Sequence, residues 1–158
     1  MTQSLSGATV AGDSRDHRLI DLVSLATLQN LQDRFAALGR MTVCIATTEG
    51  DLITRPTWGS RYSELIGASP KGGQTLVEGI RSGAKSADPS RAVTCHEGMQ
   101  LYTSPILHDG QTLALLAVGT RKQAVPPEDQ LRHIAGEYEL PPHELQAAAA
   151  LFDPRRGG

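Results

Sequence analysis

Long apolar runs, cysteine and excess basic charge are all scarce in this chain of 158 residues. The longest uninterrupted apolar runs, Leu113–Val118 and Ala147–Phe152, have six residues each, whereas a membrane-spanning helix needs about 20. Two cysteines are too few for a disulfide framework. Lysine and arginine total 15 against 17 acidic residues, so no basic field attracts nucleic acid. These shortages exclude a membrane-spanning, a disulfide-rich and a non-specific nucleic-acid-binding class for this sequence.

The rest of the composition is that of one ordinary globular domain. Apolar residues make up 39% of the chain, and counting glycine in place of tyrosine brings the share to about 47%, within the usual range. Residues 1–17 are polar without apolar periodicity, so we expect a disordered tail there, a domain over 18–153 and a frayed end at 154–158. The first residues lack the pattern of a secretory signal, and with two unpaired thiols we expect a cytoplasmic protein.

The apolar spacing predicts an α+β domain. Apolar residues recur every three or four positions from Leu25 to Leu38, which indicates an amphipathic helix. Only the second and third predicted strands are joined by a helical crossover, which favours an antiparallel sheet covered by helices on one side over a doubly wound nucleotide fold. The five predicted strands are Met41–Ala46, Leu52–Thr54, Ala92–Cys95, Met99–Leu107 and Thr112–Thr120. The other predicted helices are Tyr62–Ile66, Gln74–Ala84, Glu128–Tyr138 and Pro142–Leu151, with a loop at 69–73.

The densest polar cluster, Cys95-His96-Glu97-Gly98, falls where a predicted strand ends. A tetrahedral zinc site usually needs four ligands, but no second cysteine pair exists and Cys44 stands alone on its strand. A Cys/His nucleophile pair is disfavoured because adjacent residues on a strand point to opposite faces. The simplest reading packs Cys95 inward as a small apolar side chain. We therefore expect no catalytic residue, metal or cofactor.

Three aromatic residues are candidates for the wall of a pocket. Trp58 and Tyr62 lie four positions apart before and within a short predicted helix, and Tyr102 lies on the fourth predicted strand. Trp58 either caps the edge of the core or folds over the sheet with Tyr62 to enclose a pocket. In the second case aromatic area would dominate the affinity for a small ligand.

Several segments in a fixed order carry a resemblance to a known family. The sharpest is Cys95–Met99, which matches Cys-His-x-Gly-Leu; the others are Leu19–Phe35, Ser104-Pro105-Ile106 with Asp109-Gly110, Val118–Thr120 and Glu137–Leu145. The sequence resembles the PocR-type sensory domain, a PAS-like ligand-binding module of bacterial signalling proteins. The resemblance implies a PAS-like five-stranded antiparallel sheet with helices on one side and two C-terminal helices.

The resemblance also implies a sensory function without catalysis. The expected ligand is a small organic molecule, namely a short diol, an alcohol or a hydrocarbon derivative. The family is usually joined to an output module, such as a DNA-binding domain that regulates transcription or a kinase. Because no such module is evident here, we expect signalling through a homodimer or a separate output protein, without direct binding of nucleic acid or membrane. The expected ligand-binding residues are Trp58, Tyr62, Cys95, His96, Tyr102 and Ser104.

Two positions depart from the family pattern. Ser63 and Thr75 stand where such domains usually carry cysteines, so only Cys95 of the set remains. This departure lowers the case for a metal site or a thiol sensor. It leaves a small-molecule pocket or, as the alternative, a PAS-like interaction or scaffold domain that binds no ligand. A small enzyme or metal protein built on Cys95 and His96 is the third hypothesis.

Overall fold

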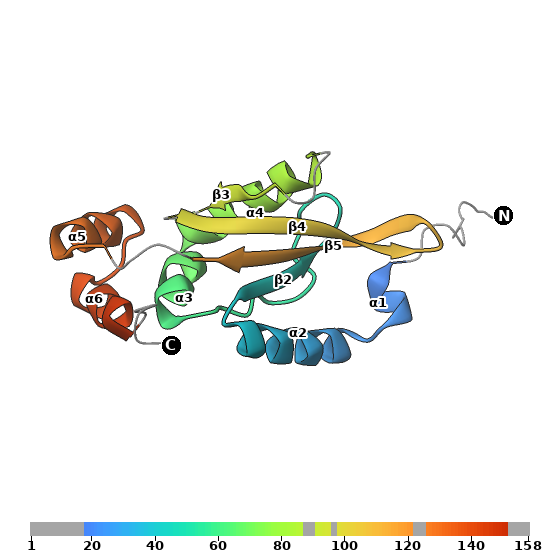
Figure 1. The fold of residues 1–158 in the computed structure, drawn as a ribbon, viewed down its shortest axis with the longest axis horizontal. Coiled ribbons are helices and arrows are strands. Elements are labelled where there is room, and N and C mark those ends of the chain that lie inside the picture. Colours follow the sequence, from blue (N-terminus) through green and yellow to red (C-terminus); the bar gives the residue numbers. More distant parts are fainter. Residues whose placement is uncertain (1–17, 87–90, 96–97, 122–125, 152–158) are drawn as a thin grey trace.

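The structure, a computed structural model, describes residues 18–86, 91–95, 98–121 and 126–151. Within these ranges the chain forms one four-stranded antiparallel sheet, in the order β2-β5-β4-β3, and six helices (Figure 1). The strands are β2 (Thr42–Ala46), β3 (Val93–Cys95), β4 (Met99–His108) and β5 (Gln111–Thr120). The helices are α1 (Leu19–Leu22), α2 (Leu25–Gly39), α3 (Arg61–Ala68), α4 (Pro70–Ala84), α5 (Glu128–Glu137) and α6 (Pro142–Leu151).

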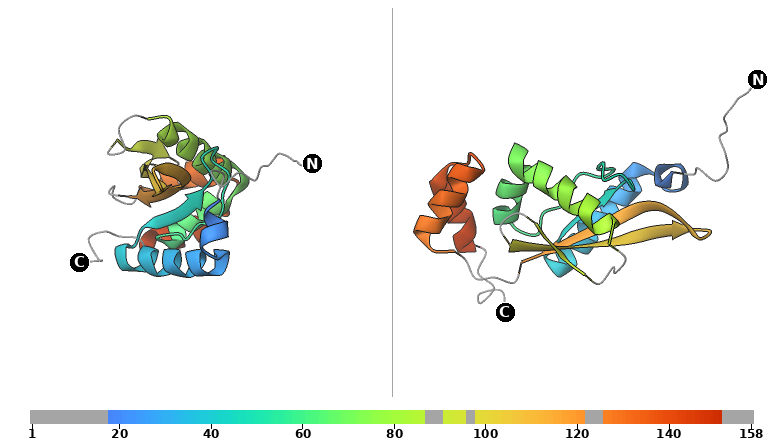
Figure 2. Two further views of the ribbon diagram at one scale, coloured as in Figure 1. Left: turned by 90° about the vertical axis from the view of Figure 1, so that its right-hand side faces the viewer. Right: turned by 90° about the horizontal axis from the view of Figure 1, so that it is seen from above.

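The two faces of the sheet have different surroundings. Cys44 pairs with Ala117, which pairs with Thr103, so these three side chains point to one face, here called the inner face. The inner face is covered by α4, and Figure 2 shows α3 and α4 on one side of the strands. The other face, here called the outer face, is covered by α1 and α2 only near β2 and the hairpin that joins β4 to β5. The core of the inner face contains Cys44, Ala46, Leu76, Ile80, Cys95, Met99, Leu101, Leu115 and Ala117.

Glycines bring α4 very close to β4. A Cβ atom at Gly79 would lie 3.1 Å from Leu101 Cδ2, and one at Gly83 would overlap Thr103 Oγ1. Four residues along a helix and two along a strand span similar distances, about 6 Å in each case. Gly79 and Gly83 of α4 are therefore spaced to lie against the inward residues Leu101 and Thr103 of β4, one glycine on each.

A polar network fixes α2 to the chain after β2. The strap, defined as residues 52–57, runs along the free edge of β2 and forms isolated bridges to it. Gln32 is buried, and its side-chain amide donates to the Arg55 carbonyl at 2.7 Å and to Thr57 Oγ1 at 2.8 Å. Ser24 caps the start of α2 by accepting from the Thr27 N–H. Buried hydrogen bonds thus join the strap to α2.

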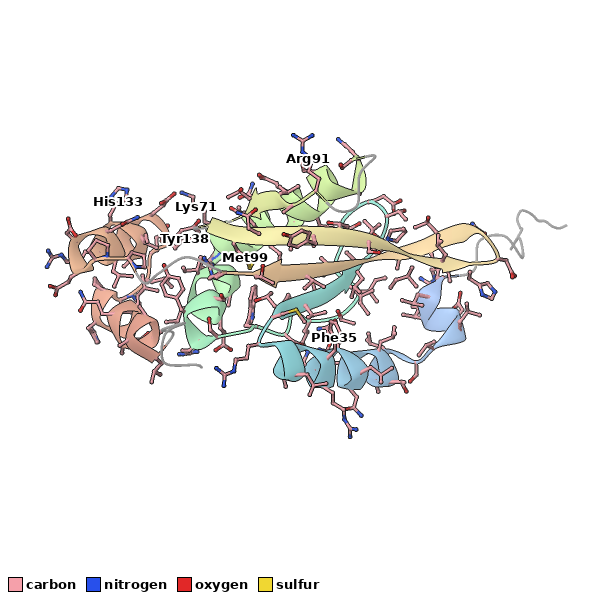
Figure 3. All side chains as sticks on the ribbon, viewed as in Figure 1. Phe35, Lys71, Arg91, Met99, His133 and Tyr138 are labelled. Atoms are coloured by element: carbon pink, nitrogen blue, oxygen red, sulfur yellow. The ribbon has the colours of Figure 1, made fainter. Side chains whose placement is uncertain are left out.

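The helices α5 and α6 pack against α3 through a second apolar cluster that includes Tyr62, Ile66 and Tyr138. Lys71 of α4 adds an ion pair, with its ammonium 2.6 Å from Glu137 Oε2, and lies 5.4 Å from the centre of the Tyr138 ring (Figure 3). In the described part of the chain, no helix is both long and apolar enough to cross a membrane.

The structure corrects three expectations about the fold. The sheet has four strands instead of five, because the Ile53 and Thr54 N–H groups both donate to the Ile45 carbonyl and no regular ladder forms there. The loop expected at 69–73 is the first turn of α4, whose N-cap is Ser69 and whose first residue is Pro70. Helices also lie on both faces of the sheet, since Leu28 of α2 packs with Ile45 on the outer face. The other predicted strands and helices are present, with ends shifted by a few residues.

The adjacent glycines Gly72 and Gly73 allow a direct test of the α3–α4 packing. A Cβ at Gly72 would overlap the Ile66 carbonyl, whereas one at Gly73 would make an ordinary 3.6 Å contact with the Gly67 carbonyl. We expect Gly72→Ala to lower the free energy of unfolding by about 2–3 kcal/mol, and Gly73→Ala to raise it by up to about 1 kcal/mol. Urea denaturation of both variants measures the difference, and equal effects would contradict the described packing.

Candidate functional site

The residues predicted to bind a ligand do not meet at one place in the structure. Cys95 pairs with Met99 and points to the inner face, where it packs against α4. Tyr102 and Ser104 alternate with the inward residues of β4 and point to the outer face. The sheet itself therefore separates Cys95 from the other two residues, and His96 lies outside the described residues.

The two aromatic residues before and within α3 also diverge. Trp58 packs directly on the inner core and covers Gly67, where a Cβ would overlap its ring. Tyr62 is buried in the cluster of α3, α5 and α6, and the Arg121 guanidinium lies 5.2 Å from its ring centre. Side chains of the inner core thus occupy the space beneath Trp58.

A cavity of about 420 Å³ opens at the other end of the inner face, where α4 ends. β4 and β5 form its floor, the C-terminal turn of α4 forms one wall, and the turn after β2 forms another. Its volume lies in the range typical of small-molecule sites. The lining residues are Thr48, Gly83, Ala84, Ser86, Thr103, Pro105, Thr112 and Leu115.

The chemistry of this cavity is uncharged and rich in hydroxyl groups. Four of its lining residues carry a hydroxyl and none is ionisable, while Leu115 and Pro105 give it an apolar floor. Thr103 is only 8% exposed, and in the described part of the chain its Oγ1 has no hydrogen-bond partner. A buried hydroxyl without a partner costs about 1–3 kcal/mol. This hydroxyl borders the cavity but faces Gly83 of α4, so a ligand reaches it only when the Thr103 side chain rotates toward the cavity.

A charged anchor fixes the turn that closes the cavity. Arg81 of α4 donates from Nε to the Glu49 carbonyl at 2.8 Å, and its Nη2 lies 3.7 Å from Asp51 Oδ1. Gly50 adopts a φ of 95° beside this arginine, a conformation that favours glycine. The turn carrying Thr48 is thus tied to the same helix that forms the opposite wall.

A second cleft, of about 520 Å³, lies outside the inner face near Trp58. Its lining includes the ionisable residues Asp33, Arg55, Arg61 and Glu64. Asp33 accepts hydrogen bonds from Thr57 and Gln29, which hold the pKa of its carboxyl below the usual value. This charged, open surface does not suit the small uncharged ligand expected from the sequence.

The cavity and the expected ligand-binding residue Ser104 lie on opposite faces of β4. Ser104 was expected to bind the ligand, whereas the cavity is lined by its neighbour Thr103. A shift of one residue reverses the face to which a strand residue points. The apolar residues Met99 and Leu101 mark the inward positions, so Thr103 is the next inward residue and the first polar one. Thr48, Ser86 and Thr112 lie in or near turns, where no alternation of apolar residues indicates the direction of a side chain.

A protein-family model described as the sensory domain found in PocR matches residues 21–152. The chain belongs to the PocR sensory domain family. No curated protein and no solved structure gives a significant match. The family is a sensory one, which supports ligand recognition over catalysis as the role of a PocR domain.

The family's cysteine positions lie at the end of α4 opposite to the cavity. Cys95 Sγ donates to the Thr75 carbonyl at 3.7 Å, so two of these positions are in contact. The third position is taken by Ser63, whose Oγ accepts from Arg121 Nε at 2.8 Å. One thiol at three positions does not fit a thiolate metal centre. Among the described residues, no three histidine, cysteine or acidic side chains group as metal ligands.

Both thiols of this PocR domain are buried. Burial, followed by the proximity of Cys95, raises the pKa of the Cys44 thiol to about 12. A thiol with so high a pKa is almost entirely protonated at neutral pH and is a poor nucleophile. The structure thus favours the simplest reading of Cys44, as a small apolar side chain of the core.

Thr103 and Thr54 allow a matched test of whether a buried hydroxyl has a hydrogen-bond partner. Thr54 is also buried, but its Oγ1 accepts from the Ile45 N–H and donates to Gln32 Oε1. We expect Thr103→Val to raise the free energy of unfolding by about 1 kcal/mol and Thr54→Val to lower it by about 1–3 kcal/mol. Urea denaturation without ligand measures both values. A loss of stability in Thr103→Val would show that its hydroxyl is already satisfied.

The Cys44 thiol predicts a dependence of stability on alkaline pH. Below pH 9.0, the ordinary pKa, the thiol is protonated in both states. From there to about pH 12 only the unfolded state releases the proton, so the free energy of unfolding falls as pH rises. At pH 10.5 the loss should be about 1–2 kcal/mol relative to Cys44→Ala, with both proteins normalised to pH 8. Parallel pH profiles of the two proteins would contradict a buried thiol.

Proposed function

We propose that this PocR domain senses a small uncharged organic molecule bearing one or two hydroxyl groups, bound in the cavity at the end of α4. The observation that carries the proposal is the neutral, hydroxyl-rich lining of the cavity, beside which the buried Thr103 hydroxyl packs against Gly83 without a hydrogen-bond partner among the described residues. Thr48, Ser86 and Thr112 supply further hydroxyls that can donate and accept. Short diols and alcohols match this lining, and so do hydrocarbon derivatives of similar size that carry one polar group.

The lining residues that the structure describes include no ionisable side chain, which favours a neutral ligand over a carboxylate or an amine. A charged molecule would lose hydration there without gaining an opposite charge. The contacts also limit the affinity. With at most about 1.5 kcal/mol per non-hydrogen atom, a five-atom ligand gains about 7.5 kcal/mol and reaches a dissociation constant of about 3 μM at best. Such an affinity suits a sensor of abundant metabolites.

Ligand binding can reach α2 through covalent and hydrogen-bonded neighbours of the cavity. Thr48 belongs to the turn that Arg81 ties to α4, and this turn continues directly into the strap. The strap in turn is bonded to Gln29 and Gln32 of α2. A ligand that braces the turn against α4 would therefore bias the position of the strap and α2. A coupling of about 1–3 kcal/mol is enough to shift a dimer or partner equilibrium.

A thermal-shift titration with propane-1,2-diol and butan-1-ol tests the proposal, with lactate and propylamine as charged molecules of similar size. We expect the neutral compounds to raise the melting temperature of the wild type and the charged ones to have no effect. Thr103→Val should abolish the shift because it removes the central hydroxyl. Ser104→Ala, on the same strand but the other face, should retain the shift in full.

The same titration tests the residues expected from the sequence. A contact of the ligand with Trp58, Tyr62, Cys95, His96, Tyr102 or Ser104 stays a prediction. Loss of the shift in Cys95→Ala with retention in Thr103→Val would move the site to the other end of α4. Absence of a shift with every compound, in a protein that folds normally, would contradict the cavity as a ligand site.

The filled space beneath Trp58 favours the second candidate function, a PAS-like interaction domain that binds no ligand. Trp58 packs on the inner core, whose residues Leu76 and Met99 are almost fully buried. A domain of this kind would associate constitutively, and its association would not change with any small molecule. Measuring the dimer equilibrium with and without the neutral compounds distinguishes it from the sensor.

A further inference from the structure

An apolar stripe on α2 remains outside the core. Leu31, Phe35 and Leu38 are 61%, 46% and 88% exposed. Their spacings of four and three residues place them along one side of the helix. The face that α2 buries is a different one, which begins at Leu28 and continues at intervals of four residues. Packing among the described residues therefore does not account for the stripe.

The stripe lies beside the uncovered part of the outer face. Gln29 and Asp33, on the opposite flank of α2, bind the strap at the free edge of β2. The stripe consequently lies on the flank toward β5 and β4. Figure 1 looks onto this face and shows none of the described helices in front of these two strands, and in Figure 3 Phe35 lies on the side of α2 toward the strands. The helix flank and the sheet face thus form two walls of one corner.

This corner carries almost no charge. The outward side chains from Gln100 to Ile106 on β4 and from Ala114 to Thr120 on β5 are uncharged. On α2 the charged residues are Asp33, which binds the strap on the other flank, and Arg34, which is exposed at the edge of the stripe, three residues after Leu31 and four before Leu38. Apart from Arg34 at its edge, the surface is neutral and brings no like charges together when it meets a copy of itself, whereas a charged partner would find little complementary field there.

We propose that this corner is the interface of a homodimer, in which the α2 stripe of each copy packs on the outer face of the other. A two-fold symmetric interface requires a surface that complements itself, and a projecting helix beside an open sheet face has this property. From their exposed fractions, the three side chains of the stripe alone offer roughly 350 Å² per copy, and the sheet face adds to this area, against about 800 Å² per partner in a standard stable interface. The inference rests on the proposed function only for the signal that the dimer transmits.

Sedimentation equilibrium of the full chain tests the interface without any ligand. We expect the wild type to dimerise at micromolar concentrations, and Leu38→Glu to raise the dissociation constant about tenfold or more, because it places an unpaired carboxylate in the interface. Ser104→Glu, on the sheet wall, should have the same effect. Leu151→Glu is the matched control, since Leu151 is 82% exposed at the end of α6 and outside the corner.

All three substituted positions are exposed, so each variant should keep the wild-type circular dichroism spectrum and melting temperature. A wild type that stays monomeric, or a dimer that Leu38→Glu and Ser104→Glu do not weaken, overturns the interface. The thermal-shift titration with diol tests the proposed ligand site separately. A chain that dimerises through Leu38 without any thermal shift would refute the ligand site and support the interface, whereas a monomeric wild type that responds to diol would overturn the interface alone.

Discussion

The close approach of α4 to β4 determines how the inner face is used. Because Gly79 and Gly83 lack side chains, the helix backbone lies directly on Leu101 and Thr103. Where the helix is present, apolar residues fill the layer between helix and sheet completely. Where it ends after Ala84, the same face continues along the long β4–β5 hairpin without a cover. The core and the cavity are therefore consecutive parts of the inner face, and the C-terminal end of α4 marks the border between them. Larger side chains at the two glycines would push α4 away from β4 and leave a gap between the core and the cavity.

Buried hydroxyls differ in their hydrogen bonding between the strap, where they are paired, and the cavity, where one is not. Around the strap, Gln32 and Thr54 satisfy each other and the neighbouring backbone, so this network holds α2 in one position. At the cavity, Thr103 has the same side chain and a similar burial but no partner in the described chain. Natural proteins seldom leave such groups unpaired without a functional reason. Thr120 Oγ1 of β5 is also buried without a partner among the described residues, but of these two threonines only Thr103 lines the cavity at the end of α4, where ligand recognition is proposed.

Much of the fold could be predicted from the sequence, whereas the cavity at the end of α4 could not. Apolar spacing identified α2, β2, β4, β5 and the two C-terminal helices, since each follows a clear period. The prediction of a strand at Leu52–Thr54 was wrong, although the residues there alternate as in a strand. Thr54 turns inward and forms hydrogen bonds with Ile45 and Gln32, and this contact is decided by tertiary packing. The family pattern directed attention to Cys95 and its neighbours, at the opposite end of α4. The cavity instead is formed by small hydroxyl residues from four separate segments. Only the alternation along β4, which places Thr103 on the same face as Met99 and Leu101, could have indicated it.

The strap gives α2 a position that depends on both faces of the sheet. Its first residues continue from the turn at the cavity, on the inner face, and its last residues bind Gln29 and Asp33 of α2, which borders the outer face. The sheet between them is held by paired strands and is the stiffer element. If a ligand occupies the proposed site, a displacement of the turn would be passed along the edge of β2 to α2 through these hydrogen bonds. Because α2 and the outer face form the corner proposed for the dimer, such a displacement would alter how well two copies fit, and the proposed sensor would signal through a change in association.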